Sequence, residues 1–138
     1  MRAFRVAYDG AEYRGFQRQP HGETIEDTLF DALRELDVEF RDGSPLGYAA
    51  AGRTDAGVSA REQTIAFETP TWLTPRALNS ELPASIRAWA AADVPDSFHA
   101  THGATERRYR YMLYARDCDD SLARKAAKKL SGAHDFHN

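Results

Sequence analysis

A change of hydrophobic period near residue 24 constrains the fold of this chain more than any other feature. Over residues 4–8 apolar and other side chains alternate, and this period of two predicts a half-buried strand. After Thr24 the apolar residues recur at helical spacing instead, at Ile25, Leu29, Leu33 and Leu36. Thr24 and Asp27 form a pair of the capping-box type, which predicts where this helix begins. The charged residues of the helix are expected mostly away from the apolar positions; they are Glu26, Asp31, Arg34 and Glu35.

Further elements follow from the same two periods. A loop is expected over residues 11–22, and the residues Asp42-Gly43-Ser44-Pro45 are expected to interrupt the chain. Strands are predicted over 48–51, 64–67, 86–94 and 107–114, and helices over 74–82 and 121–130. This order predicts an α+β fold, an antiparallel sheet with helices packed on one face, as in half of a ferredoxin-like domain.

Composition excludes some classes of protein. With 42% hydrophobic and 28% charged residues the chain can form a packed core, and it has no apolar run of the roughly 20 residues that cross a bilayer. No secretory signal precedes the first strand, so we expect a cytoplasmic protein without a membrane partner. The net charge of −3 argues mildly against nucleic acid. Arginines nevertheless cluster at Arg14 and Arg18, and at Arg107, Arg108 and Arg110.

The segment from Gly52 to Gly57 is the strongest candidate for a chemical site. Two glycines enclose Arg53, Thr54 and Asp55 directly after a predicted strand, and glycines permit a tight turn and close approach of another molecule. An arginine beside an aspartate can bind phosphate and keep the carboxylate ionised. Such a carboxylate can act as a nucleophile or a base without a metal. The structural alternative is that Asp55 caps a turn and Arg53 pairs with it.

Two other segments are candidates for contacts with RNA. The predicted strand 107–114 places Tyr109, Tyr111 and Leu113 on one face and arginines on the other, so its rings could stack on bases. It could equally be a sheet strand with a tyrosine core face and solvated arginines. The segment 13–19 could hold an RNA backbone, or it could be a polar surface loop.

Metal and nucleotide cofactors are not expected. The pairs His99 and His102, and His134 and His137, each supply only two ligands. Cys118 is the only cysteine, has acidic neighbours, and is expected to be an unreactive surface thiol. No phosphate-binding glycine loop or dinucleotide fingerprint occurs.

Several segments together resemble the TruA-type tRNA pseudouridine synthases. The resemblance covers nearly the whole chain, and its most specific part is the block containing Asp55. The matching segments, in order, are Tyr8-Asp9-Gly10, Gly15-Phe16-Gln17-Arg18-Gln19, Thr24-Ile25-Glu26, the run from Ala51 to Val58, Asn79-Ser80-Glu81-Leu82-Pro83, Phe98-His99-Ala100 and Arg108-Tyr109-Arg110-Tyr111.

The resemblance implies a specific activity and specific residue roles. Members of this family isomerise uridine to pseudouridine in the anticodon stem-loop of tRNA, at positions 38–40, as homodimers without cofactor or metal. Asp55 matches the catalytic aspartate, Arg53 an arginine that helps displace the target nucleotide, and Tyr109 the tyrosine that stacks on the uracil. Further candidate RNA contacts are Arg14, Gln17, Arg18, Arg108 and Arg110.

The chain also departs from the family pattern. Ser59 stands where many bacterial members have histidine, and Thr101 where many have arginine, which puts one RNA contact in doubt. Members carry a second half that completes the catalytic cleft. We therefore expect residues 1–116 to form the ferredoxin-like domain with the catalytic aspartate, and residues 117–138 to be the start of a truncated second half. The 138 residues alone are expected to have little or no isomerase activity.

Two alternatives to the enzyme stay open on residue pattern. One is a non-catalytic RNA-binding module in which Tyr109 and Tyr111 form a stacking platform. The other is a structural subdomain that only dimerises. Loss of conversion in Asp55→Ala with retained tRNA binding would distinguish the enzyme from the module, and salt-dependent tRNA binding would exclude the dimerisation subdomain.

Overall fold

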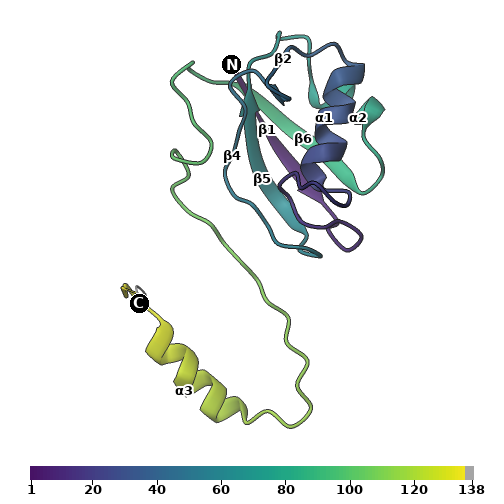
Figure 1. The fold of residues 1–138 in the computed structure, drawn as a ribbon. Coiled ribbons are helices and arrows are strands. Elements are labelled where there is room, and N and C mark those ends of the chain that lie inside the picture. The colour runs from purple at the N-terminus through teal and green to yellow at the C-terminus, as the bar shows by residue number, and fades with distance from the viewer. Residues whose placement is uncertain (136–138) are drawn as a thin grey trace. The chain divides into compact units, whose positions relative to one another are not determined.

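The computed structural model describes residues 1–135 and divides the chain into two compact units, Met1–Arg107 and Arg108–Asn138. The second unit contains one helix, α3 (Asp120–Leu130). The first contains β1 (Arg2–Tyr8), α1 (Ile25–Glu35), β2 (Phe40–Arg41), β3 (Ser44–Pro45), β4 (Ala49–Ala50), β5 (Ala60–Phe67), α2 (Pro75–Glu81) and β6 (Ile86–Asp93) (Figure 1). The expected division of the chain after residue 116 stays a prediction. The last residues of the predicted second segment, including Phe136 and His137, lie outside the described residues.

The main sheet has the strand order β4-β5-β1-β6, and its neighbouring strands are all antiparallel. β1 is central: Phe4 lies opposite Ile65 of β5, and Val6 opposite Ala88 of β6. Along the chain α1 lies between β1 and β4, and α2 lies between β5 and β6. In neither case are the two strands adjacent in the sheet. This arrangement confirms the predicted α+β fold and the ferredoxin-like half.

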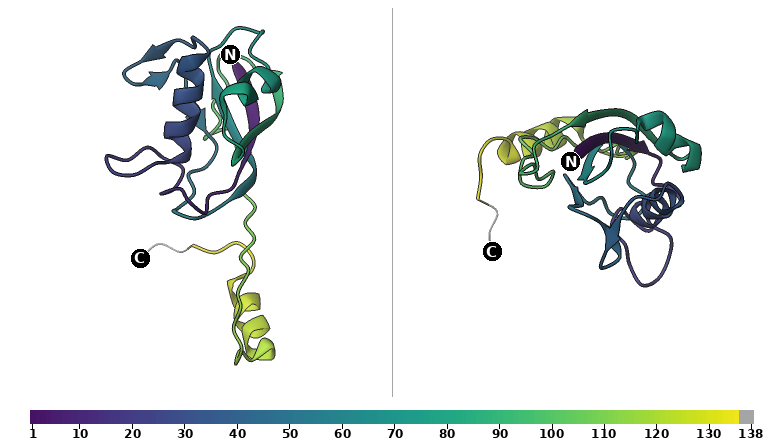
Figure 2. Two further views of the ribbon diagram at one scale, coloured as in Figure 1. Left: turned by 90° about the vertical axis from the view of Figure 1, so that its right-hand side faces the viewer. Right: turned by 90° about the horizontal axis from the view of Figure 1, so that it is seen from above.

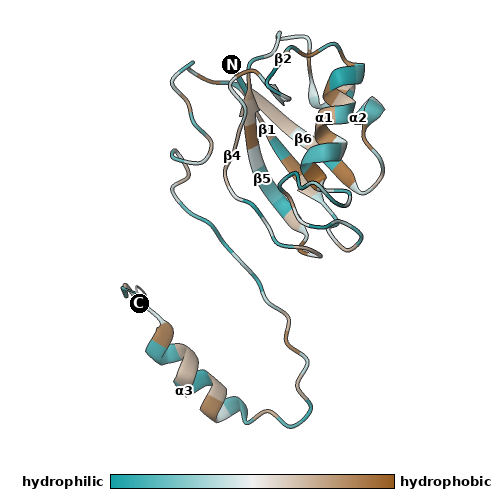
Figure 3. Cartoon of the chain, viewed as in Figure 1, coloured by the Kyte–Doolittle hydropathy of each residue, from teal (hydrophilic) through white to brown (hydrophobic). Residues whose placement is uncertain are grey.

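One face of the sheet carries the core. The alternating residues Phe4, Val6 and Tyr8 are buried with the apolar residues of both helices in a single cluster. The rings of Phe4 and Phe67 stack with centroids 5.2 Å apart across the β1–β5 pair. Figure 2 shows α1 to one side of the sheet, and Figure 3 shows hydrophobic and hydrophilic residues side by side along α1. The helices therefore pack on one face, as predicted.

Helix α1 begins where the sequence predicts. The Thr24 side chain accepts a hydrogen bond from the Asp27 amide, and the Asp27 carboxylate accepts one from the Thr24 amide, which completes the capping box. Of the charged residues expected mostly away from the apolar positions, Asp31, Arg34 and Glu35 are exposed, but Glu26 is buried, with only 7% of the residue exposed. Its burial results from β3 and the residues before β4, which cover this end of the helix.

The interruption predicted at residues 42–45 is a small hairpin. β2 and β3 pair antiparallel, with Phe40 opposite Pro45 and Arg41 opposite Ser44. Asp42 and Gly43 form the connecting turn, and both have positive φ values, 52° and 80°. Two-residue turns of this conformation favour Asp-Gly, because they match the twist of the flanking strands.

The prediction of a strand over residues 107–114 was wrong. The segment has no helix or strand, and it belongs to neither of the two sheets. Tyr109 and Tyr111 are 72% and 87% exposed. Alternation specifies which side chains share a face, but a strand also needs a hydrogen-bonding neighbour.

The second unit is otherwise simple. The Asp119 side chain accepts a hydrogen bond from the Leu122 amide and caps α3, confirming the predicted helix over 121–130. Leu122 and Leu130, which are two four-residue steps apart on this helix, are both exposed. Within residues 1–135, none of the helices has the length and hydropathy that crossing a membrane requires.

Candidate active site

The loop between β4 and β5 carries Arg53 and Asp55, and a buried glutamine holds Gly52 near its start. Gln63 lies on β5 with its side chain 7% exposed. Its amide nitrogen donates to the Gly52 carbonyl at 2.6 Å, and its amide oxygen accepts from the Gly52 amide at 3.2 Å. The side chain thus imitates a strand partner and sets the direction in which the loop leaves the sheet.

Thr54 fixes the middle of this loop from two sides. The Tyr8 hydroxyl, at the end of β1, lies 2.8 Å from the Thr54 hydroxyl. The Thr54 carbonyl accepts a hydrogen bond from the Phe16 amide at 2.9 Å. Asp55 follows directly, so its exposed side chain stands on backbone that is held from both directions.

The end of the loop is attached to the end of β1. The Ser59 hydroxyl accepts from the Gly10 amide at 3.0 Å and lies 3.1 Å from an Asp9 carboxylate oxygen, to which it donates. A Cβ atom at Gly10 would lie 2.1 Å from the Val58 carbonyl oxygen, so only glycine fits this approach. Ser59, at a position where histidine is common in the family pattern, therefore has a structural role here.

Asp55 lines a polar depression of about 350 Å³, which we call the Asp55 pocket. Three of the residues predicted from sequence, Arg14, Gln17 and Arg53, line it together with Asp55. The complete lining is Arg14, Gly15, Gln17, Gln19, Arg53, Thr54, Asp55 and Ala56. The loops 14–19 and 53–56 thus bring cations, amides and one carboxylate into a single concave surface, suited to contacts with phosphate and base edges.

Arg53 does not hold Asp55 by an ion pair, contrary to the expectation from their spacing. Among the described residues the ion pairs of the chain involve neither side chain. The ion pair that the structural alternative assumed is therefore absent as well, among the described residues, although Asp55 does begin a turn. The turn is instead closed by the backbone, through the Val58 amide and the Asp55 carbonyl at 3.2 Å.

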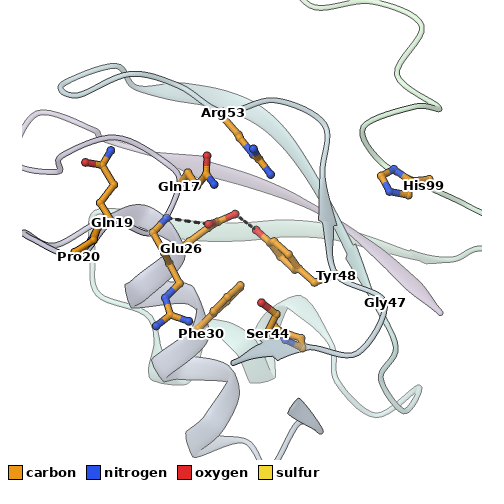
Figure 4. Close-up of a pocket in the computed structure, with 12 residues that line it drawn as sticks. Gln17, Gln19, Pro20, Glu26, Phe30, Ser44, Gly47, Tyr48, Arg53 and His99 are labelled. Atoms are coloured by element: carbon orange, nitrogen blue, oxygen red, sulfur yellow. Dashed lines mark hydrogen bonds between the residues drawn. The ribbon is translucent and has the colours of Figure 1, made fainter. Parts of the chain in front are cut away.

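Arg53 also lines a second, larger depression of about 770 Å³, which we call the Glu26 pocket (Figure 4). At its base the Glu26 carboxylate accepts hydrogen bonds from the Tyr48 hydroxyl at 3.1 Å and from the Arg18 amide at 2.9 Å. Figure 4 shows the Arg53 side chain extending toward this pair. The complete lining is Gln17, Arg18, Gln19, Pro20, Glu26, Phe30, Ser44, Pro45, Gly47, Tyr48, Arg53 and His99.

The remaining predicted residues lie elsewhere. Arg18 lines the Glu26 pocket, but its guanidinium is engaged by the Asp27 carboxylate at 2.9 Å and the Gly43 carbonyl at 2.8 Å. It therefore has a structural role at the start of α1. Arg108, Tyr109 and Arg110 belong to the second unit, and their convergence with Asp55 stays a prediction.

Tyr48 has an unusual electrostatic environment. Burial raises the pKa of its phenol well above the usual value of 10.0, and the negative charge and hydrogen bond of Glu26 raise it further. Its ring packs edge-on against Phe30, with centroids 4.8 Å apart. Tyr48 is consequently a permanent hydrogen-bond donor to Glu26 near neutral pH.

This raised pKa predicts a dependence of stability on pH. Above about pH 10 the unfolded phenol ionises while the folded one stays protonated, so stability falls as pH rises. Relative to Tyr48→Phe, the wild type should lose up to about 1.4 kcal/mol per additional pH unit. Urea unfolding of both proteins between about pH 8 and pH 11 measures the difference. If the free energies of unfolding of the two proteins changed with pH in parallel over this range, the raised pKa of Tyr48 would be contradicted.

Sequence reasoning missed the Glu26–Tyr48 pair and the Gly10–Ser59 attachment. The two members of each lie 22 and 49 residues apart in sequence, and no short-range period indicates such a contact. A weak signal existed for Gly10, since a glycine directly after a strand is typical of a turn or a close approach. Among the described residues, no group of three or more histidine, cysteine, aspartate or glutamate side chains is arranged to hold a metal ion.

Comparison with known proteins gives consistent similarities. The chain is 71% identical over 140 residues to the tRNA pseudouridine synthase A of Natronomonas pharaonis, covering 100% of this chain and 52% of that protein. It is 56% identical over 148 residues to the protein of the same name from Haloarcula marismortui, and 47% identical over 138 residues to that of Methanosarcina acetivorans. The chain spans about half the length of these relatives. No family model matches it.

Proposed function

Because the chain belongs to the tRNA pseudouridine synthase A family, we propose that it forms part of an isomerase that converts uridine to pseudouridine in tRNA, with Asp55 as the catalytic residue. The observation that carries the proposal is the Asp55 pocket. It presents an exposed carboxylate on a fixed loop, next to Arg14, Gln17 and Arg53. Relatives named tRNA pseudouridine synthase A match 99–100% of the length of this chain.

The chemistry requires what this pocket offers. The C1′–N1 glycosidic bond breaks, the uracil rotates, and a C1′–C5 bond forms; the hydrogen on C5 is released and N1 gains a proton. Nothing is oxidised or hydrolysed, so the reaction needs no cofactor. Asp55 could attack the sugar, add to the base, or remove a proton from the ribose, and all three routes need an unobstructed carboxylate. The exposed position of Asp55 supports this role.

Substrate and assembly are part of the proposal. The target is a uridine of the anticodon stem-loop that is extruded from the base stack. In this proposal Tyr109 stacks on the extruded uracil, and Arg53 occupies the place that the nucleotide leaves in the stem-loop. Arg14 and Gln17 support this proposal because they line the same depression as Asp55. Arg108 and Arg110 are proposed as further contacts. By the same family resemblance the protein acts as a homodimer, and we propose that it does so in the cytoplasm.

Release of tritium from tRNA labelled at C5 of uridine tests the function. The natural protein that carries this chain is expected to release tritium catalytically, because C5 loses its hydrogen when the new bond forms. Binding of the same tRNA should weaken steeply with added salt, since each neutralised phosphate releases counterions. Salt-dependent binding without tritium release would instead indicate a non-catalytic RNA-binding module.

A further inference from the structure

We propose that Glu26 is a positioning residue: it attracts the Arg53 guanidinium to its own side of the loop and so leaves the Asp55 carboxylate open to substrate. The inference rests on the proposed isomerase function and deepens it. It assigns a role to a buried carboxylate that does not line the Asp55 pocket. Glu26 would act on the reaction only through Arg53.

The first step concerns the charge of Glu26. Both carboxylate oxygens accept hydrogen bonds, but from neutral donors, the Tyr48 hydroxyl and the Arg18 amide. Within residues 1–135 no ion pair involves Glu26. A carboxylate that is 7% exposed and lacks a cationic partner has a strong, little-screened attraction for a nearby cation.

The second step identifies that cation. Two arginines line the Glu26 pocket, Arg18 and Arg53. The guanidinium of Arg18 is already engaged by Asp27 and Gly43. Arg53 is exposed, it extends toward the Glu26–Tyr48 pair (Figure 4), and its positive charge acts on Tyr48. Arg53 is therefore the available counter-charge.

The third step concerns Asp55. Arg53 and Asp55 are two residues apart and line the same pocket, so an ion pair between them would be the default arrangement. Such a pair would cover the carboxylate that must reach the sugar or base. The pair is not formed in the structure, and Glu26 supplies the physical reason, because it competes for the same guanidinium.

Glu26→Gln tests the inference with minimal disturbance. Glutamine keeps the shape and an acceptor for Tyr48 or Arg18, but removes the charge. We expect the single-turnover rate of tritium release to fall on the order of 10-fold to 100-fold, as expected of a misplaced group at a reacting centre, with unchanged tRNA affinity. In an Arg53→Gln background the same substitution should have no further effect. A merely structural role would give equal losses in both backgrounds. Glu35→Gln, an exposed position at the end of the same helix, is the matched control and should keep the wild-type rate.

Two measurements keep the test independent of activity. A crystal structure of Glu26→Gln should show the Arg53 guanidinium paired with the Asp55 carboxylate; an Arg53 unchanged in position would overturn the inference even if the protein proved inactive on tRNA. Arg53→Gln should also lower the midpoint of urea denaturation, because the buried Glu26 charge loses its counter-charge. If Glu26→Gln does not fold, this midpoint decides whether Arg53 is the counter-charge of Glu26. An unchanged midpoint is the usual result at an exposed position and would contradict the proposal. All rates refer to the natural protein that carries this chain, and inactivity of that wild-type protein would instead refute the proposed function.

Discussion

Asp55→Asn is expected to reduce pseudouridine formation on the order of 10²- to 10⁴-fold while tRNA binding is retained, because it removes the proposed nucleophile or base. The fold should be unaffected. The Asp55 side chain is exposed, and among the described residues it forms no ion pair. Tritium release under single-turnover conditions measures the rate, and fluorescence anisotropy with labelled tRNA measures the affinity.

Asp31→Asn provides the matched control for this substitution. Asp31 is also an exposed aspartate, but it lies on α1 and pairs with Arg34 rather than lining a pocket. It should keep the wild-type rate, apart from a small loss of stability from the surface ion pair. Wild-type conversion by Asp55→Asn would refute the catalytic assignment. Conversion that falls only in parallel with tRNA affinity would make Asp55 a binding residue instead.

Gly10→Ala is expected to have the largest effect of any single-methyl change in the chain. The new Cβ would lie 2.1 Å from the Val58 carbonyl oxygen. The Cβ is bonded directly to the backbone and the oxygen is a backbone atom, so neither can move without displacing its segment. We expect a loss of about 1–3 kcal/mol of stability from overpacking. Displacement of the loop that carries Asp55 should also lower the rate of tritium release on the order of 10²-fold. Urea unfolding and single-turnover kinetics measure the two effects.

Gly52→Ala is the control for Gly10→Ala, because it adds the same methyl group directly to the loop between β4 and β5 that Gly10 contacts. Its Cβ would meet nothing closer than 3.8 Å, and the hydrogen bonds of Gly52 with Gln63 use only its backbone. Stability and rate should therefore stay close to wild type. If the two alanine variants behaved alike, the attachment of the loop to the end of β1 would not be what positions Asp55.

The sequence predicted those parts of the fold whose causes are local. Thr24 and Asp27 form a capping box within one turn, so the start of α1 could be located from the residues themselves. β2 and β3 were missed because strands of two residues are too short to show alternation, although Asp42 and Gly43 favour the turn between them. The strand predicted over 107–114 failed for the opposite reason: its alternation is clear, but a strand requires a partner that alternation does not supply.

The candidate site divides in the same way. Asp55, Arg53, Arg14 and Gln17 were predicted from residue types and resemblance, and the structure brings these four to one pocket. The burial of Glu26 could not be predicted, because it depends on the partner Tyr48, which only the folded chain brings close. The absence of an Arg53–Asp55 pair likewise depends on a competing charge from another element. Spacing predicted that these groups would be neighbours, but it could not show which of them would pair.

The hydrogen bonds that hold the loop between β4 and β5 also determine when the Asp55 pocket can form during folding. The Tyr8–Thr54 and Gly10–Ser59 hydrogen bonds join residues 46 and 49 positions apart, and both require β1 to lie in register beside β5. Contacts of such long sequence separation close slowly, because the chain loses the entropy of the intervening loop before it gains the contact. A nascent or partly unfolded chain can therefore contain a well-formed α1 before the Asp55 pocket exists, because that pocket forms only with the central strand pair.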